Sequence, residues 1–358
     1  MKLEQLFKLA MEQGASDIHL LAGNLPIFRV DGVLQRLTNM PEMTGQLIEE
    51  LVIPLLTGEQ KSKFERLWEL DFSYELPGYC RLRVNLHREK GSIGLVARII
   101  PSVIPTMEDV NMPGVVYDII RQDRGLILLT GPAGCGKSTS LAAMINLINK
   151  EQNRHIITLE DPIEFVFTSQ KSIVRQRQLD IDMLSFQESL GHVLRQDPNV
   201  LMVGEMRDLE TIASTITLAE TGHLVLATLH TYDAGQTIDR IVDIFPPHQQ
   251  SQIRLQVSIT LKGIISQRLL PQVDGGRIAA REILLNNPAI SYLIRDNKIN
   301  QIRSVMQTSA KEGMFTMDQD LRGLYKRGLI TKATAESHMV DPSALMEDEE
   351  EKEERKKK

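Results

Sequence analysis

The segment GPAGCGKS at residues 131–138 constrains this chain more than any other feature. It satisfies the pattern G-x-x-x-x-G-K-[ST] in full, and its surroundings are those that the pattern requires. The apolar run at 125–130 is typical of a strand, and apolar residues over 141–148 recur at helical spacing. A strand, a glycine-rich loop and a helix in this order indicate a loop that cradles phosphate groups.

The chemistry of this loop follows from its residue types. Glycines let the backbone curl until its N–H groups point at phosphate oxygens, and the helix N-terminus adds the positive end of its dipole. Lys137 can reach the β and γ phosphates, and the hydroxyl of Ser138 can join the coordination shell of Mg²⁺. The residues predicted to bind the nucleotide are Gly131, Pro132, Ala133, Gly134, Cys135, Gly136, Lys137, Ser138 and Thr139.

Length and composition bound what surrounds this loop. A chain of 358 residues is too long for one ordinary core, so two domains are expected. Its 42% hydrophobic and 25% charged residues are typical of a globular protein, and no apolar stretch approaches the ~18 residues of a membrane span. The N-terminal segment predicts an amphipathic helix, with Leu3, Leu6, Phe7 and Ala10 on one face, rather than a targeting segment.

Cysteine usage and charge narrow the class further. Cys80 and Cys135 are too few for a disulfide framework or a four-thiolate zinc site, and Cys135 inside the loop indicates a reducing compartment. The net charge of −6 and the aromatic content of 4% weigh against a nucleic-acid partner. These features predict a soluble cytoplasmic enzyme.

The first 100 residues predict a small α+β domain. Strands are expected at 18–20, 27–30, 81–86 and 94–100. Asp31-Gly32 is a hairpin-turn dipeptide between two apolar runs. Apolar spacing over 48–56 favours a helix, which Pro54 interrupts.

A proline-rich linker that would serve as a hinge is predicted at 101–113, because its prolines remove backbone donors and discourage helix. Over 114–345, apolar strands alternate with helices. The strands are expected at 125–130, 155–159, 200–204 and 224–229. Continuous apolar strands between helices indicate an α/β fold with a mainly parallel sheet covered on both faces.

The last third of the chain is predicted to be mostly helical, from the spacing of apolar residues over 290–306. Residues 346–358 form a block of charges, which favours a solvated disordered tail over a binding segment. Domain boundaries are therefore expected near residues 100, 113 and 345.

Acidic residues follow two of the predicted strands. The strand at 155–159 ends in EDPIE, which carries Glu160 and Glu164, and the strand at 200–204 is followed by Glu205. A nucleotide hydrolase needs one carboxylate near Mg²⁺ and another that orients the attacking water. Both carboxylates are expected at the carboxyl ends of strands, beside the phosphate loop. A single acidic residue at such a position is as often a helix cap or loop charge as a catalytic group. Two acidic strand ends together predict a hydrolase.

Two histidines bracket the strand at 224–229. His230, at its carboxyl end, is expected on the nucleotide side of the sheet, and His223 is expected at the opposite end unless the chain bends there. The spacing leaves that alternative open, and an isolated histidine is more often structural than catalytic.

Arginines of the first domain form a further group. Arg81 and Arg83 share one face of their strand by its period of two, and Arg98 lies on the next strand. Taken alone, such residues are more often part of a solvated strand face. An arginine supplied across a subunit boundary would instead stabilise charge on the γ-phosphate.

Seven segments of the chain occur in the order that one family shows. They are ASDIHL (15–20), RVDG (29–32), GPAGCGKST (131–139), LEDPIEF (159–165), VGEMRDLETI (203–212), TGHLVLATLHT (221–231) and TIDRIVDIFP (237–246). From about residue 1 to 340 the chain resembles the secretion and pilus motor ATPases, with their Walker A, Asp box, Walker B and His box. An additional N-terminal domain and a tetracysteine insertion are typical of the assembly branch, so their absence favours the branch that retracts type IV pili.

The resemblance implies a PAS-like domain at 1–100 and a RecA-like ATPase domain with a helical C-terminal part. It implies a homohexamer that binds ATP and Mg²⁺ between subunits, at the cytoplasmic face of the inner membrane. The implied partners are an inner-membrane pilus platform protein and a paralogous retraction ATPase. The implied function is ATP hydrolysis that powers pilus retraction and twitching motility. An accessory retraction ATPase and a secretion-type assembly ATPase are the alternatives.

Catalytic residues carry over motif by motif. The resemblance implies that Lys137 and Ser138 hold phosphate and Mg²⁺, that Glu164 activates the attacking water, and that Glu205 supports Mg²⁺ through water. These assignments give the two acidic strand ends separate roles.

Histidines and arginines carry over in the same way. His223 matches the His-box histidine linked to nucleotide sensing, and His230 lies in the same box. Arg83 and Arg98 match arginines directed at the nucleotide, from the same or a neighbouring subunit. The resemblance thus favours a functional role for Arg83 and Arg98, whereas the sequence pattern alone predicts only that they lie on a solvated strand face.

Three departures from the family bear on the branch. Ser291 and Tyr292 replace the Arg and Asn of the AIRNLIRE helix found in retraction members, and residues 176–178 are QRQ in place of QRE. Arg268 is typical of the secretion branch. These changes leave the ATPase chemistry untouched and keep an accessory role open.

Overall fold

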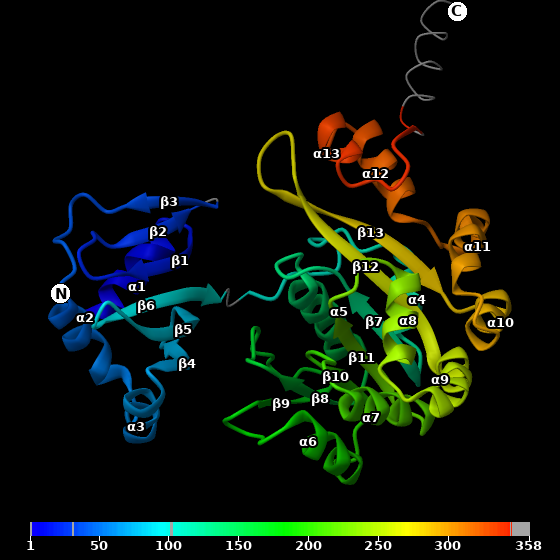
Figure 1. Ribbon diagram of the computed structural model, residues 1–358, viewed down its shortest axis with the longest axis horizontal. Coiled ribbons are helices and arrows are strands. Elements are labelled where there is room, and N and C mark those ends of the chain that lie inside the picture. The colour runs from blue at the N-terminus through cyan, green and yellow to red at the C-terminus, as the bar shows by residue number, and fades with distance from the viewer. Residues whose placement is uncertain (1, 31, 101–102, 344, 346–358) are drawn as a thin grey trace, which may run out of the picture. The chain divides into compact units, whose positions relative to one another are not determined.

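The computed structural model describes residues 2–30, 32–100, 103–343 and 345 (Figure 1). The chain divides into two compact units between Val103 and Ile104. Asp31 of the predicted hairpin turn, Pro101 of the predicted linker and the predicted tail at 346–358 lie outside the described residues. Nowhere in the described ranges does a helix have both the length and the apolar content that crossing a membrane requires.

The first unit is built on a six-stranded antiparallel sheet in the order β3-β2-β1-β6-β5-β4. Its strands are β1 (Ala15–Leu20), β2 (Ile27–Val30), β3 (Val33–Arg36), β4 (Glu69–Leu76), β5 (Cys80–Glu89) and β6 (Ser92–Ile100). Its helices are α1 (Leu3–Glu12), α2 (Gly45–Val52) and α3 (Gly58–Leu67). The four strands predicted by range in this region are present as β1, β2, β5 and β6, and β3 and β4 are additional to them.

Sequence patterning explains two of these helices. α1 confirms the predicted amphipathic face. Its buried side chains are Leu3, Leu6, Phe7 and Ala10. α2 ends at Val52, and Pro54 lies in a short 3-10 turn, η1 (Ile53–Leu55), because proline has no N–H to continue the α-helical ladder. The helix predicted over 48–56 is therefore shorter at its carboxyl end.

The second unit is built on a seven-stranded sheet in the order β13-β12-β7-β11-β10-β8-β9. Its strands are β7 (Gly125–Thr130), β8 (His155–Glu160), β9 (Ile173–Gln178), β10 (Val200–Val203), β11 (Leu224–Leu229), β12 (Leu261–Pro271) and β13 (Arg277–Leu285). All neighbours pair in parallel except β12 with β13. The predicted α/β class with a mainly parallel sheet is confirmed.

Helices cover both faces of this sheet. They are α4 (Gly114–Ile120), α5 (Lys137–Glu151), α6 (Phe186–Val193), α7 (Leu209–Glu220), α8 (Ala234–Asp243), α9 (Pro247–Thr260), α10 (Pro288–Arg295), α11 (Ile302–Thr308), α12 (Met317–Lys326) and α13 (Lys332–Glu336). Short 3-10 turns are η2 (Leu194–Gln196), η3 (Ile299–Gln301) and η4 (Ala310–Glu312). Leu126 and Leu128 of β7 pack in one core with α6 to α11, whereas Ile127 and Leu129 pack in another with α4 and α5.

Part of the predicted linker belongs to the second unit. Met107 and Met112 are buried in the core that α4 and α5 share with the sheet. Thr106 and Asp109 each accept a hydrogen bond from the other's backbone N–H. The part of the predicted linker from Ile104 to Pro113 therefore belongs to the second unit.

A long antiparallel hairpin of β12 and β13 stands where the last third of the chain was predicted to be mostly helical. β12 has 11 residues and β13 has 9, and β12 also pairs in parallel with β7, so the hairpin extends the main sheet. Within the second unit, the hairpin runs from α9 and α10 at one end to α12 and α13 at the other (Figure 1). The helices predicted over 290–306 are present as α10 and α11.

Candidate nucleotide site

The carboxyl ends of four neighbouring strands meet at one edge of the second unit's sheet. Thr130 of β7 lies beside Leu229 of β11, Ala227 lies beside Val203 of β10, and Val203 lies beside Leu159 of β8. The glycine-rich loop, both acidic segments and His230 follow these strands directly. The sheet therefore brings together most of the groups that the sequence singles out.

The glycine-rich loop has the curled backbone that its sequence predicts. Gly131 has a φ of 144°, and a Cβ there would lie 2.2 Å from the backbone O of Gln267 and 2.7 Å from Sγ of Cys135. Only glycine fits such a position. Cys135 itself is buried beneath the loop with 3% of its surface exposed, and Gly136 begins α5 as its N-cap residue.

Lys137 lies at the centre of the site and bends back over its own loop. Its Nζ donates hydrogen bonds to the carbonyl oxygens of Gly131, at 2.6 Å, and Pro132, at 3.0 Å. The same Nζ lies 3.4 Å from Nδ1 of His230. The ammonium group is therefore held at the mouth of the loop by neutral acceptors.

Burial and nearby charge act on Lys137 in opposite directions. Burial lowers the pKa of Lys137, and the charges of Cys135, Glu205 and Glu164 oppose that shift. Glu205 follows β10 and Glu164 follows β8, the strand paired with β10, so both acidic segments leave the sheet at the same edge. Acidic groups at this edge, beside the loop, suit a site for a metal-bound phosphate.

Glu205 is held by two cationic or titratable partners. Its Oε1 lies 3.0 Å from Nε2 of His230, and its Oε2 accepts a hydrogen bond of 2.7 Å from Nη2 of Arg207. Burial raises the pKa of Glu205, but the hydrogen bond and charge of Arg207 and the charges of His230 and Lys137 outweigh burial, so the pKa is lowered. The carboxylate is ionised at neutral pH.

Glu160 differs from Glu164 although both follow β8. Glu160 is 6% exposed, and its Oε1 accepts hydrogen bonds from Thr158 at 2.6 Å and from Gln176 at 3.0 Å. Burial raises the pKa of Glu160. Gln176 also donates to the carbonyl oxygen of Phe165, so it fixes the segment that carries Glu164. Glu160 is thus a buried support for the segment, whereas Glu164 is half-buried.

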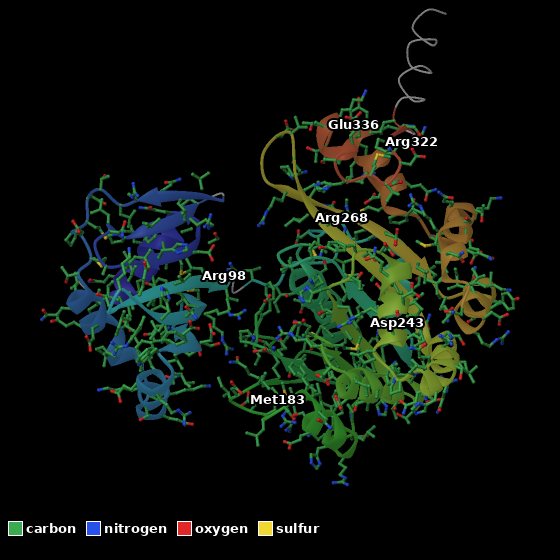
Figure 2. All side chains as sticks on the ribbon, in the orientation of Figure 1. Arg98, Met183, Asp243, Arg268, Arg322 and Glu336 are labelled. Carbon is green, nitrogen blue, oxygen red and sulfur yellow. The ribbon has the colours of Figure 1, made fainter. Side chains whose placement is uncertain are left out.

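A cavity of about 300 Å³ adjoins the loop on the side of β12. Its lining residues are Pro132, Ala133, Gly134, Cys135, Tyr232, Arg268, Leu269, Leu270 and His338. Arg268 lies on the hairpin (Figure 2) and donates a hydrogen bond to the carbonyl oxygen of His338. Ser138 and Thr139 are half-buried in the first turn of α5. The loop therefore borders the cavity at residues 132–135 and continues directly into α5.

His223 is not part of this cluster within the chain. It precedes β11, its Nδ1 lies 3.0 Å from the carbonyl oxygen of Leu218, and its own carbonyl oxygen accepts from the backbone of Gly125 at the start of β7. The six residues of β11 separate it from His230 by roughly 20 Å. The chain does not bend there, so His223 lies at the opposite end of β11 from His230, as the direction of the strand predicts, and its catalytic role stays a prediction.

Arg83 and Arg98 lie in the first unit, as cross-strand neighbours on β5 and β6. Nε of Arg98 donates a hydrogen bond of 2.8 Å to Oδ1 of Asp17 on β1, and 67% of the Arg98 side chain is exposed (Figure 2). Two arginines and one buried carboxylate therefore share one region of this sheet, consistent with the predicted strand face.

Asp17 gives the first unit a defined acid dependence. Burial raises the pKa of Asp17, but hydrogen bonds from Arg98 and Ser16 outweigh it, so the folded-state pKa lies below 3.8. Its contribution is present above that ordinary value and is lost as pH falls through the lower folded-state pKa. We expect Asp17→Asn to destabilise the first unit by about 1 kcal/mol at pH 7 and to flatten its stability profile between about pH 5 and 2.

Trp68 makes this measurement selective, because it is the one tryptophan of the sequence and follows α3 of the first unit. Denaturant unfolding is followed by Trp68 emission at several pH values. Glu65→Gln, at an exposed position of α3, is the matched control. An Asp17→Asn profile that parallels the wild type would contradict the expectation.

Sequence analysis missed two buried polar residues behind the loop. Gln267 and Arg281 are each 2% exposed, and Nε2 of Gln267 donates to the carbonyl oxygen of Cys135 at 2.7 Å. Both lie on the hairpin that patterning did not predict. Within each strand, the available signal was a polar residue inside an apolar run.

Comparison with known proteins agrees with this geometry. The family described as Type II/IV secretion system protein matches residues 107–313. The type IV pilus retraction ATPase PilT of Pseudomonas aeruginosa is 46% identical over 94% of this chain and 97% of that protein. The type IV pilus ATPase PilU of the same organism is 39% identical over 94% of this chain and 88% of that protein.

Solved structures give the same relation. The crystal structure of the pilus retraction motor PilT with bound ADP has a TM-score of 0.91 and 46% identity, covering 97% of this chain and 99% of that chain. The similarity therefore includes both units. The chain belongs to the type II/IV secretion system protein family and is an ATPase.

Proposed function

We propose that this chain hydrolyses ATP to power retraction of a type IV pilus. The observation that carries the proposal is a chain of contacts at the mouth of the glycine-rich loop. Nζ of Lys137 lies 3.4 Å from Nδ1 of His230, and Nε2 of His230 lies 3.0 Å from Oε1 of Glu205. The relation to PilT, a pilus retraction ATPase that also has a structure with bound ADP, supplies the process that the hydrolysis would drive.

ATP would bind with its phosphates in the loop at 131–139. The carbonyl oxygens that Lys137 contacts are neutral, whereas phosphate oxygens are charged and form hydrogen bonds about twice as strong. Lys137 would therefore transfer its donors from Gly131 and Pro132 to the phosphates. The adjoining cavity of about 300 Å³ provides space for the rest of the nucleotide.

The residues present fit Mg²⁺. The Ser138 hydroxyl, in the first turn of α5, and the ionised Glu205 carboxylate are hard oxygen donors of the kind that Mg²⁺ prefers. Ser138 would hold the ion directly and Glu205 through water. When bound, the ion neutralises charge on the phosphates during transfer.

Hydrolysis requires a group that orients the attacking water, and Glu164 is the proposed catalytic residue. Glu164 follows β8, the strand paired with β10, so its segment leaves the sheet at the same edge as Glu205. Glu205 contacts Arg207 and His230, and its ionised carboxylate would support the metal through water. His230 would respond to the phosphate through its contacts with Lys137 and Glu205.

The assembly is part of the proposal. PAS-like and RecA-like units, with a helical C-terminal part, would form a homohexamer with ATP between subunits. Arg83 and Arg98 would approach the nucleotide from a neighbouring subunit and stabilise charge on the γ-phosphate. The ring would act at the cytoplasmic face of the inner membrane on the pilus platform protein. A paralogous retraction ATPase is a further partner, and the relation to PilU favours an accessory role as the second candidate function.

Glu164→Gln tests the proposed chemistry. We expect ATP turnover to fall about 10² to 10⁴-fold while ADP affinity stays within about twofold, because the amide cannot accept a proton from water but keeps its volume. Phosphate release measures turnover and calorimetry measures ADP binding. Glu188→Gln, at an exposed position of α6, is the control.

The same variants separate the cellular roles. In a piliated host that lacks its own retraction ATPase, the wild-type chain is expected to restore twitching and Glu164→Gln is not. If the Glu164→Gln variant restored twitching, ATP hydrolysis at this site would not be what powers retraction. Wild-type turnover without restored twitching would favour the accessory role.

A further inference from the structure

Gln267 supports the phosphate loop from beneath with both its backbone and its side chain. Its backbone oxygen occupies the space that a side chain at Gly131 would need. Its Nε2 donates to the carbonyl oxygen of Cys135 at 2.7 Å, and its Oε1 accepts from Oγ of Ser140 on α5 at 2.9 Å. The loop and the start of α5 are therefore fixed to one residue of β12.

Arg281 extends this support to the segment that follows the first unit. Its Nε donates to Oε1 of Gln267 at 3.0 Å, while Nη1 and Nη2 donate to the carbonyl oxygens of Asn111, at 2.9 Å, and Val110, at 2.7 Å. Asn111 has a φ of 49°, so this backbone turns sharply where Arg281 holds it. One side chain thus links β13, β12 and residues 110–111.

The charge of Arg281 argues against a purely structural purpose. Burial lowers its pKa to about 10, so the guanidinium remains charged at neutral pH although 2% of the residue is exposed. Asp320, which accepts a hydrogen bond from the Arg281 backbone, opposes that shift. Buried charges of this kind are often no better for stability than apolar residues of similar size, so stability alone does not explain a guanidinium here.

The segment that Arg281 holds lies in the second unit, shortly after the boundary between the units. Residues 104–112 follow β6, which carries Arg98, and lead to α4. Met107 and Met112 anchor the segment in the core beside α5. A change at the phosphate loop therefore has a contiguous hydrogen-bonded route, through two side chains, to the backbone that leads to the first unit.

We propose that Gln267 and Arg281 are positioning residues that couple nucleotide binding at the loop to the segment at 106–112. They hold the Cys135 carbonyl in the curvature that accepts phosphate, and they transmit the change on binding to the carbonyls of Val110 and Asn111. The inference rests on the proposed binding of ATP and ADP at this loop. It adds a regulated connection that the phosphate-binding motif does not itself contain.

Hydrogen exchange in the full chain tests the coupling. Backbone amides at 106–112 are measured with and without ADP and Mg²⁺. In the wild type, we expect nucleotide to change the exchange rate of at least one of these amides by about tenfold or more. Arg281→Met and Gln267→Met keep the side-chain volume but remove the connection, so this response should fall below about twofold in both.

Affinity measurements give a second readout. We expect the affinity for ADP to fall about tenfold in each methionine variant. Because both residues act in one network, the double variant should bind ADP no more weakly than the single variant with the lower affinity. Arg281→Lys, which keeps the charge, should recover part of the affinity. Arg277→Met, at the exposed start of β13, should leave affinity and exchange unchanged.

The outcomes are distinguishable. If the wild type binds no ADP, the proposed function fails. If it binds ADP but both methionine variants keep the exchange response, the coupling is overturned, even where their thermal stability falls. If Arg281→Met does not fold, Gln267→Met decides the question alone, because it leaves Arg281 bonded to the carbonyls at 110 and 111.

Discussion

Replacing Lys137 with alanine is expected to abolish ATP turnover while leaving the chain folded. The ammonium group lies at the mouth of the glycine-rich loop, 3.4 Å from Nδ1 of His230, and it is placed to transfer its donors to phosphate. Removing such a preorganised donor lowers turnover by about 10² to 10³-fold, and weaker nucleotide binding adds to that loss.

Retention of the fold follows from the same contacts. The bonds of Lys137 go to loop carbonyls of Gly131 and Pro132, and burial of the ammonium opposes folding, so their loss is expected to change stability by about 1 kcal/mol. Phosphate release, calorimetry with ADP and a thermal unfolding scan measure the three quantities. Lys150→Ala, at the exposed end of α5, is the control, and full turnover of Lys137→Ala would discard the site.

Replacing Gly131 with alanine is expected to damage both the fold and the site. The new Cβ would lie 2.2 Å from a backbone oxygen, which cannot rotate away as a side chain would, and the φ of 144° is one that L residues rarely adopt. Backbone strain and overpacking of about 1–3 kcal/mol each give a total of about 2–6 kcal/mol. ADP binding should be lost, because the loop must shift away from Gln267.

Gly134→Ala separates the collision from the backbone strain. Gly134 also has a positive φ, of 76°, but no heavy atom lies within 4 Å of its added Cβ. We expect it to lose only about 1 kcal/mol. Far-UV circular dichroism during denaturant unfolding follows the second unit, while Trp68 emission follows the first. Equal losses in the two variants would show that packing against Gln267 does not matter.

The sequence predicted the strands that are buried on both faces. The runs at 125–130 and 224–229 are apolar throughout because every residue of β7 and β11 is buried, so their pattern is unambiguous. β9, at 173–178, was not predicted. It is an edge strand with the sequence IVRQRQ and mixed exposure, which short-range patterning does not separate from a loop.

The hairpin escaped prediction for a different reason. Its inner positions carry buried polar residues such as Gln267 and Arg281, which break the apolar period, and its turn at 274–276 (DGG) was the signal that could have found it. Tertiary hydrogen bonds to the phosphate loop and to residues 110–111 make those polar residues acceptable in the core. Because these hydrogen-bond partners are far away in the sequence, local patterning could not identify them.

The candidate site was predicted where motif order and strand direction agree. Glu205 and His230 follow neighbouring parallel strands, so their meeting is a consequence of topology. Glu160 and Glu164 were not separated by sequence, because their difference is one of burial. His223 lies at the amino end of β11, as strand direction predicts, and its catalytic role is implied by the resemblance alone.

The burial of Cys135 has a consequence for chemical durability. Oxidants and alkylating reagents attack the thiolate, and burial raises the pKa of this thiol above 9.0, so little of it ionises at neutral pH. The loop covers the sulfur atom, which is packed against Gly131. We therefore expect the thiol of Cys135 to react slowly with oxidants and alkylating reagents at neutral pH, although it lies within the phosphate-binding loop.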